Sequence, residues 1–246
     1  MVAGVTTAMI LAAGFGKRLR PITDTVPKPL VPVGGKTMLD RSLDLAGSAG
    51  VARAVVNVHY LADQIIGHCA KRASPAITIS DETAGILETG GGVVKALPLL
   101  GTDPFLLLNA DTFWVEWGRP NLTAMIERFD PAEMDILLML CRLRDTTGHA
   151  GGADFAIGAD GRLTRLADKT DPAGVLYAGA TIYNPAIFAE SAAEPHSLNL
   201  YYDRAAAEGR LFGHVMEDGH WFTVGTPEAL PAAETKLDSL ARQRAD

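Results

Sequence analysis

The residues best suited to chemistry lie close together near the start of the chain. An apolar run over residues 8–12 leads into Gly14 and Gly16, and the cations Arg18 and Lys28 follow. Glycines at the end of a strand allow a sharp turn and expose backbone N–H groups. Exposed amides together with fixed cations form a binding site for a polyphosphate. We therefore expect this stretch to hold the phosphates of a nucleotide.

Two common phosphate-binding motifs fail on spacing. A dinucleotide fingerprint needs a third glycine three residues after Gly16, but Leu19 occupies that place. A P-loop needs a glycine five residues before its Gly-Lys-Ser/Thr; the tail is present at residues 35–37, but Leu30 stands at the leading position. Another phosphate-binding motif is required.

The stretch resembles the signature of the sugar-1-phosphate nucleotidyltransferases. The matching residues are Leu11-Ala12-Ala13-Gly14-x-Gly16-x-Arg18-Leu19, then Pro21 and Pro27-Lys28-Pro29-Leu30. A surface turn with solvated charges would leave the Pro-Lys-Pro sequence and its fixed distance unexplained. The resemblance implies an enzyme that joins a nucleoside triphosphate and a sugar 1-phosphate, releases pyrophosphate and uses Mg²⁺.

The order of the expected elements predicts an α/β fold in a single nucleotidyltransferase domain, residues 1–246. Strands separated by helices indicate a Rossmann-like three-layer α/β/α sandwich with a mostly parallel central sheet, of the nucleotide-diphospho-sugar transferase type. The expected helices cover residues 38–49, 61–73, 93–100, 198–208 and 226–244. The expected strands cover residues 52–58, 76–80, 105–109, 135–141, 154–157, 163–166, 176–183 and 211–216, with a hairpin turn at residues 159–161.

Composition narrows the possible partners and the location. The formal net charge of −7 argues against nucleic-acid binding. No apolar run approaches the roughly 20 residues that span a bilayer, and the first apolar run lacks the basic flank of a signal peptide. Cys69 and Cys141 form no disulfide framework or metal motif and are expected in the core. We expect a cytoplasmic enzyme without nucleic-acid or membrane partners, either a monomer or a homodimer.

Polar side chains follow the apolar strand expected at residues 105–109. This strand delivers Asn109 and Asp111 to the same edge of the sheet as the glycine loop, because ligands of open α/β sheets collect at the carboxyl ends of strands. A lone carboxylate beside phosphates commonly holds Mg²⁺, and the resemblance assigns this metal to Asp111. An aspartate that caps a turn is the simpler alternative.

The resemblance implies roles for further residues. It assigns catalysis to Arg18, Lys28 and Asp111. The nucleotide-binding residues are expected to be Leu11, Ala12, Ala13, Gly14, Gly16, Lys17, Thr89 and Gly90. The sugar-phosphate-binding residues are expected to be Glu88, Asn109, Gly152, Asp168, Lys169, Tyr177 and Gly179. A solvated charge pair is the alternative for Asp168 and Lys169.

Two features between residues 81 and 92 suggest contacts with the nucleotide. Glu82 offers only acceptors, which suit the N3–H donor of uracil, although an exposed loop acid is an equal alternative. Residues 90–92 are three consecutive glycines; they indicate a ligand lying against bare backbone, with a flexible turn as the alternative.

One position departs from the family pattern. Near the C-terminus the family carries an acidic second metal ligand, and Thr223 stands there in Trp-Phe-Thr-Val-Gly-Thr over residues 221–226. Asp218 could replace that ligand, the metal could rely on Asp111 and phosphates, or the activity could be weak. A non-catalytic sugar-nucleotide sensor is therefore an alternative of another class.

Three blocks, at residues 57–59, 88–100 and 105–109, are most similar to the uridylyltransferases that act on N-acetylmuramate 1-phosphate in bacterial cell-wall recycling. UTP and that sugar phosphate are the expected substrates. A guanylyltransferase acting on mannose 1-phosphate is the near alternative, because these subfamilies share every catalytic motif.

Overall fold

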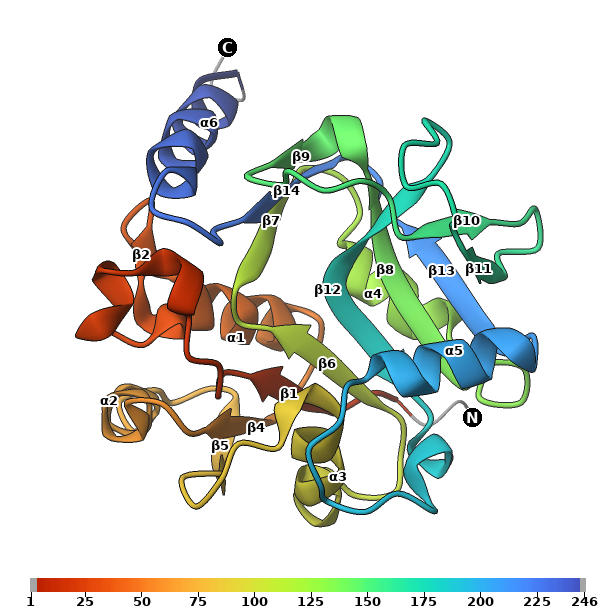
Figure 1. The fold of residues 1–246 in the computed structure, drawn as a ribbon, viewed down its shortest axis with the longest axis horizontal. Helices are drawn as coiled ribbons and strands as arrows, with labels where there is room; N and C mark the ends of the chain where they lie inside the picture. Colours follow the sequence, from red (N-terminus) through yellow and green to blue (C-terminus); the bar gives the residue numbers. More distant parts are fainter. Residues whose placement is uncertain (1–3, 244–246) are drawn as a thin grey trace.

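In the computed structural model, residues 4–243 are described, and they contain a nine-stranded mixed sheet. The sheet runs in the order β11-β10-β12-β6-β1-β4-β5, while β8 pairs with β12 and β13 pairs with β8 (Figure 1). Its strands are β1 (Thr7–Leu11), β4 (Arg53–Val58), β5 (Ala76–Asp81), β6 (Phe105–Asn109), β8 (Ile136–Arg142), β10 (Phe155–Ile157), β11 (Leu163–Arg165), β12 (Val175–Tyr183) and β13 (Leu211–Val215).

The first half of the chain builds the parallel part of the sheet. Strands β6, β1, β4 and β5 lie side by side and parallel, with Ile10 opposite both Val56 and Leu108. The mostly apolar sequences of β1, β4 and β6 follow from burial on both faces, whereas β5 lies at the edge of the sheet and is partly exposed. Because the strands are parallel, their carboxyl ends share one edge of the sheet.

Helices cover both faces of the sheet. Ala8 and Ile10 of β1 pack in one core with α1 (Met38–Ser48), α2 (Ala62–Cys69) and α4 (Asn121–Arg128). Met9, which points the other way, packs in a second core with α3 (Glu88–Leu100) and α5 (Asn199–Ala207). The predicted three-layer α/β/α fold is confirmed.

The second half of the chain adds antiparallel pairs. The long strand β12 runs antiparallel to both β6 and β8, and the predicted hairpin at residues 159–161 connects the antiparallel strands β10 and β11. The pairing of β12 with β8 is interrupted between Tyr177 and Thr181, where Gly179 has φ +83°. This irregularity bends β12 beside the end of β6.

A smaller sheet, which the sequence analysis did not predict, continues from the end of β6. It contains β7 (Thr112–Glu116), β14 (Gly219–Thr223) and β9 (Thr146–Thr147), and the Phe113 and Phe222 rings stack with centroids 4.8 Å apart. The short strands β2 (Pro32–Val33) and β3 (Lys36–Thr37) form a separate hairpin. Together with α6 (Ala229–Gln243), these elements bury a third apolar cluster, which contains Leu19, Val31 and Val224.

Several predicted boundaries differ from those in the structure. Helix α3 begins at Glu88 rather than at residue 93 and continues through Pro98. Helix α6 begins at Ala229, after a turn in which the Ala229 N–H donates to the carbonyl of Thr226, and its expected end at residue 244 lies outside the described residues. Helix α4 was not predicted.

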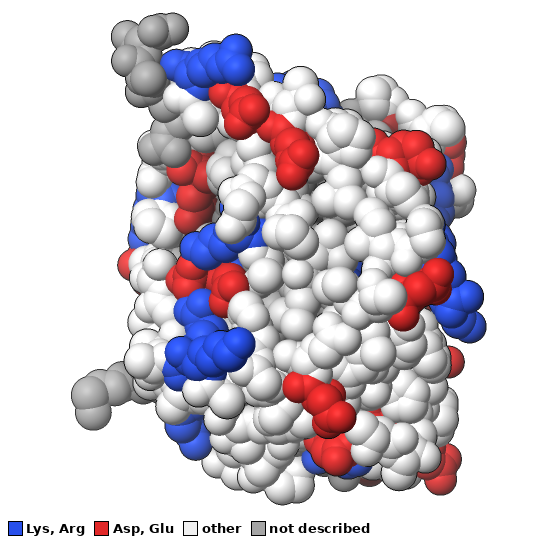
Figure 2. Space-filling view, turned by 90° about the vertical axis from the view of Figure 1, so that its left-hand side faces the viewer, with Lys and Arg blue, Asp and Glu red and all other residues white. Residues whose placement is uncertain are grey.

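Three other features of residues 4–243 concern the cysteines, the helices and the surface charge. Both cysteines are free and buried, as expected of core residues. No helix in this range is both long enough and apolar enough to cross a membrane. On the face at the left of Figure 1, Lys and Arg side chains are interspersed with Asp and Glu side chains, so neither charge dominates it (Figure 2).

Candidate active site

The carboxyl ends of the parallel strands form the walls of two adjoining pockets. Leu11 at the end of β1 lies opposite Asn109 at the end of β6, and the glycine loop follows β1 directly. This is the edge at which open α/β sheets bind ligands. Leu11, Gly14 and Asp111 border both pockets, so one ligand with two parts could occupy the two together.

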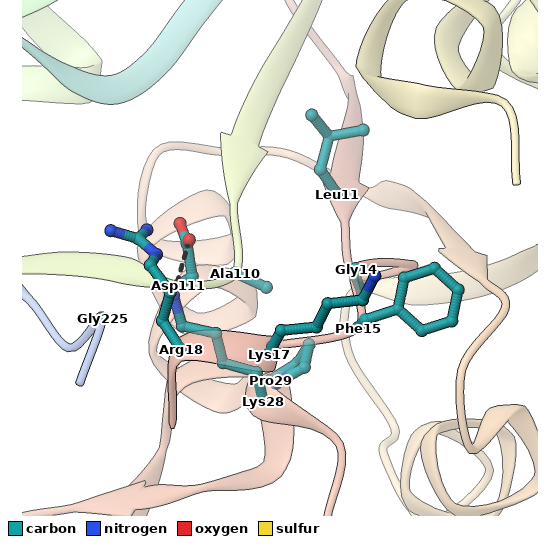
Figure 3. A pocket seen from close by; sticks show the side chains of 12 residues that line it. Leu11, Gly14, Phe15, Lys17, Arg18, Lys28, Pro29, Ala110, Asp111 and Gly225 are labelled. Carbon is teal, nitrogen blue, oxygen red and sulfur yellow. Dashed lines mark hydrogen bonds and ion pairs between the residues drawn. The ribbon is translucent and has the colours of Figure 1, made fainter. Parts of the chain in front are cut away.

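The first of these, here called the cationic pocket, has a volume of about 400 Å³. Its lining residues are Leu11, Ala12, Gly14, Phe15, Gly16, Lys17, Arg18, Lys28, Pro29, Ala110, Asp111 and Gly225 (Figure 3). The positive charges come from one short stretch of sequence. The backbone turns there because Gly16 has φ +63° and precedes a short 3₁₀ turn, η1 (Lys17–Leu19). The guanidinium of Arg18 lies beside Gly225.

An ion pair crosses the cationic pocket. Lys28, on the 3₁₀ turn η3 (Lys28–Leu30), is only 8% exposed, and its Nζ lies 2.8 Å from Oδ2 of Asp111. The Asp111 side chain is 42% exposed and therefore open to the pocket. The structure thus brings the three predicted catalytic residues, Arg18, Lys28 and Asp111, to one pocket.

The donor set around Asp111 fits a magnesium ion that is shared with a substrate. Among the described residues no group of three or more His, Cys, Asp or Glu side chains could enclose a metal ion. Mg²⁺ keeps several waters and is commonly bound by one or two carboxylates plus substrate phosphates. One open carboxylate facing a cationic pocket meets that requirement without a protein cage.

Thr223 and Asp218 are the two residues that could add a second metal ligand beside Asp111, and of these Thr223 lies near it. Thr223 pairs with Thr112, the residue that follows Asp111, in the β14–β7 ladder. Asp218 precedes the other end of β14, where its carbonyl accepts from the N–H of Trp117. Asp218 therefore does not replace the acidic ligand that the resemblance implies at position 223.

The second pocket has a volume of about 460 Å³ and a different lining. Its walls are Leu11, Ala13, Gly14, Asn57, Ile86, Glu88, Thr89, Asn109, Asp111 and Ser197. No lysine or arginine is among these residues, so its polar groups are neutral hydrogen-bonding groups and the carboxylates of Glu88 and Asp111, set among apolar side chains. Ser197 was not anticipated, because it comes from the second half of the chain and belongs to no motif.

Glu82 lies behind the wall of the second pocket. It is fully buried; Oε1 accepts from Asn57 Nδ2 at 2.7 Å and Oε2 accepts from the Leu87 N–H at 3.2 Å. Asn57 in turn accepts from the Ala12 N–H at 2.7 Å. Both carboxylate oxygens are thus used inside the protein, and Glu82 is not the exposed loop acid of the alternative interpretation.

The three consecutive glycines are explained by packing within the protein. A Cβ at Gly90 would lie closer than 3.0 Å to His196, one at Gly91 closer than that to the carbonyl of Glu194, and one at Gly92 closer than that to Glu82. The Gly90 N–H also donates to the carbonyl of His196 at 2.8 Å. Close approach of the chain itself, rather than of a ligand, therefore accounts for residues 90–92. Contact of Gly90 with a nucleotide stays a prediction.

The remaining predicted sugar-phosphate residues lie outside both pockets. Asp168 accepts hydrogen bonds from Thr170 within its own exposed turn, and the carbonyl of Lys169 accepts from the Ala153 N–H beside Gly152. A Cβ at Gly179, on the bend of β12, would lie 3.4 Å from Cβ of Asn109. The structure does not bring Gly152, Asp168 or Lys169 to the pocket walls.

Tyr177 is partly buried near the start of β12. Its hydroxyl hydrogen-bonds to Thr181 at 2.8 Å. Burial and the neighbouring Tyr202 raise the pKa of Tyr177 well above its ordinary value. The side chain is therefore neutral, and it supports the strand beside Asn109 rather than lining a pocket.

Comparison with known proteins agrees with the fold. The sequence model of the nucleotidyl transferase family matches residues 7–239, nearly the whole chain, and the chain belongs to this family.

Two bacterial relatives share a name. An N-acetylmuramate alpha-1-phosphate uridylyltransferase of Caulobacter vibrioides is 43% identical over 94% of this chain and 96% of its own. The protein of that name from Neisseria meningitidis is 36% identical over 74% of this chain and 76% of its own. A probable mannose-1-phosphate guanylyltransferase of Oryza sativa is 27% identical over 96% of this chain and 66% of its own.

Solved structures confirm the fold at lower sequence identity. An inositol-1-phosphate CTP transferase from T. maritima superposes with a TM-score of 0.76 at 18% identity, over 97% of each chain. An apo UDP-glucose pyrophosphorylase gives a TM-score of 0.77 at 15% identity, over 96% of this chain and 99% of that one.

Proposed function

We propose that this protein is a uridylyltransferase that joins UTP and N-acetylmuramate α-1-phosphate to UDP-N-acetylmuramate and pyrophosphate. The observation that carries the proposal is the cationic pocket, where Arg18, Lys28 and Asp111 converge on a glycine loop. The choice of substrates is supported by relatives of that name at 43% and 36% identity. Such an enzyme would act in cytoplasmic recycling of cell-wall sugars.

The chemistry is a displacement at phosphorus. An oxygen of the sugar phosphate forms a bond to the α-phosphorus of UTP, the bond from that phosphorus to the bridging oxygen of the β-phosphate breaks, and pyrophosphate leaves with the electron pair. The attacking oxygen is already an anion, so no side chain has to remove a proton. The enzyme must instead bring two polyanions together and stabilise the leaving group.

The residues of the cationic pocket suit that task. Arg18, beside Gly225 on the outer wall, would hold the β- and γ-phosphates, and exposed amides of the glycine loop would bind the same oxygens. Lys28 would exchange Asp111 for the α-phosphate as the substrate enters. Mg²⁺ held by Asp111 and phosphate oxygens would supply Lewis-acid charge when bound.

The second pocket would take the base and the sugar parts of the substrates. Thr89, Asn57 and Asn109 supply hydrogen-bonding groups for a base and for sugar hydroxyls, and Glu88 adds acceptors. Selection of one sugar phosphate over another would come from this pocket, because the phosphates, which all candidate substrates share, would bind in the cationic pocket.

A matrix of four nucleoside triphosphates against several sugar 1-phosphates, scored by pyrophosphate release with Mg²⁺, tests the proposal. The expected result is the highest kcat/KM with UTP and N-acetylmuramate α-1-phosphate. Preference for GTP and mannose 1-phosphate would establish the guanylyltransferase alternative. Binding of nucleotide sugars without any pyrophosphate release would establish the sensor alternative that Thr223 motivates.

A further inference from the structure

The loop that carries the exposed amides and the cations Lys17 and Arg18 is not part of a strand or an α-helix. Residues 14–18, here called the anion loop, run into the short 3₁₀ turn η1, which begins at Lys17, and then into a second one, η2 (Ile22–Asp24), rather than into the long helix that stiffens other phosphate loops. Triphosphate binding needs amides and cations that already point at the ligand. Something outside the loop must therefore hold it in position.

Thr23 supplies the first link. It is fully buried on η2, and its hydroxyl donates to the carbonyl of Gly16 at 2.9 Å. The same carbonyl accepts from the Leu19 N–H at 2.9 Å, so both of its lone pairs are used. The Thr23 methyl group packs against the left-handed Gly16, with Cγ2 only 3.0 Å from the site of a Cβ there.

Tyr60 supplies the second link, from the connection between β4 and α2. Its hydroxyl donates to the carbonyl of Thr23 at 2.9 Å. Its ring lies 5.7 Å from the ring of Phe15, whose other neighbour is His59 at 5.3 Å. Tyr60 therefore contacts the anion loop directly through Phe15 and indirectly through Thr23.

We propose that Thr23 and Tyr60 are positioning residues, which fix Gly16 and thereby aim the amides and cations of the anion loop at the triphosphate. Neither residue lines the cationic pocket or the second pocket, so neither is expected to touch a substrate. The chain of contacts runs from the rigid end of β4 through Tyr60 and Thr23 to Gly16. The inference rests on the proposed function for the identity of the triphosphate.

A positioning role differs measurably from a purely structural one. If the two residues only stabilised the fold, their loss would lower the melting temperature and leave the KM values of the folded enzyme unchanged. If they aim the anion loop, their loss raises the KM for UTP and leaves the KM for the sugar phosphate nearly unchanged, since Gly14 is the one residue of the anion loop that lines the second pocket.

The experiment compares isosteric variants. Thr23→Val removes the hydroxyl and keeps the shape, Thr23→Ser keeps the hydroxyl, and Tyr60→Phe keeps the ring. Gln64→Leu is the matched control, because Gln64 also donates from α2 to this region, to the carbonyl of Thr25 at 2.9 Å, but not toward Gly16. Kinetics are measured at a temperature where circular dichroism shows every variant folded.

The expected result is a rise of about fivefold in the KM for UTP in Thr23→Val and in Tyr60→Phe, the effect of losing one hydrogen bond. Thr23→Ser and Gln64→Leu should stay within about twofold of the wild type. Unchanged KM values in both isosteric variants, an equal rise in the two KM values, or a Thr23→Ser variant as impaired as Thr23→Val would each overturn the inference.

Failure of the proposed function would be recognised separately. If the wild-type protein releases no pyrophosphate with any substrate pair, the proposed function is wrong. Titration calorimetry with inorganic tripolyphosphate then decides the inference alone. Weaker binding by Thr23→Val than by wild type and Thr23→Ser would support it, whereas equal binding by the three proteins, or none, would overturn it.

Discussion

The two adjoining pockets are built in different ways. The cationic pocket takes Lys17, Arg18 and Lys28 from one short stretch of sequence. The second pocket takes its polar groups from the ends of β4 and β6, the start of α3 and the segment before α5, and it contains no lysine or arginine. Strong charge is concentrated on one side, and dispersed hydrogen-bonding groups occupy the other.

This difference separates the general part of the reaction from the selective part. Every nucleoside triphosphate carries the same phosphates, so a local and rigid set of cations can serve any of them. Bases and sugars differ in the placement of donors and acceptors, which groups from several elements must match. Damage to the cationic pocket should therefore lower activity with all substrates, whereas changes in the second pocket should alter selection among them.

The largest effect is expected from Lys28→Ala. Lys28 is the buried cation of the cationic pocket, and loss of one such preorganised charge commonly lowers the rate by about 10² to 10³. Pyrophosphate release measures the change, which should be similar for every nucleotide. Lys17→Ala is the control, because the Lys17 ammonium lies over the Phe15 ring, 5.1 Å from its centroid, and pairs with no carboxylate of residues 4–243. Equal losses in the two variants would contradict the special place of Lys28.

A loss of about 10² is expected from Asp111→Asn, since the amide is a poorer magnesium ligand and the variant keeps the shape of the side chain. Activity should require Mg²⁺, vanish with EDTA and, in the variant, need more Mg²⁺ for half-maximal rate. A variant with wild-type rate and an unchanged magnesium requirement would show that the metal is held elsewhere.

A change of about tenfold in one KM is expected from Glu88→Gln. Glu88 and Asp111 are the two carboxylates of the second pocket, and Glu88 does not line the cationic pocket, so this substitution removes a charged acceptor from the second pocket alone. The measured quantity is the ratio of kcat/KM values among nucleotides and among sugar phosphates. Binding of inorganic tripolyphosphate should not change. An equal loss with all substrates would mean that the two pockets do not divide the work.

The smallest effect on chemistry is expected from Gly91→Ala, because that glycine serves packing. Its Cβ would meet the carbonyl of Glu194, and overpacking of this kind lowers the free energy of unfolding by about 1–3 kcal/mol. Gly67→Ala is the matched control, because Gly67 lies within α2 with open space around it. Alanine there should raise the free energy of unfolding by about 0.5–1 kcal/mol. Chemical denaturation measures both. A Gly91→Ala variant as stable as wild type would contradict the packing explanation.

The sequence predicted the parallel half of the fold and the cationic pocket because both depend on local patterns. The strand at residues 105–109 was placed correctly, and Arg18, Lys28 and Asp111 do meet. A motif with fixed spacing encodes the loop and its cations, and the parallel pairing of β1 with β6 brings Asp111 to them.

What the sequence did not reveal depends on contacts between distant segments. The strands β7 and β14 are more than a hundred residues apart in the sequence, and no local pattern predicts that they pair with each other. Glycines 90–92 were attributed to a ligand because the segment that fills the space at Gly90 and Gly91, residues 194–196, is equally far away. The burial of Glu82 behind Asn57 likewise depends on tertiary packing, which the local sequence does not show.

A crystal structure with Mg²⁺ and a non-hydrolysable UTP analogue tests the division of the two pockets most directly. The account predicts the triphosphate in the cationic pocket, with the α-phosphate between Lys28 and Asp111 and the uridine in the second pocket. A triphosphate bound away from Lys28 and Arg18 would contradict it.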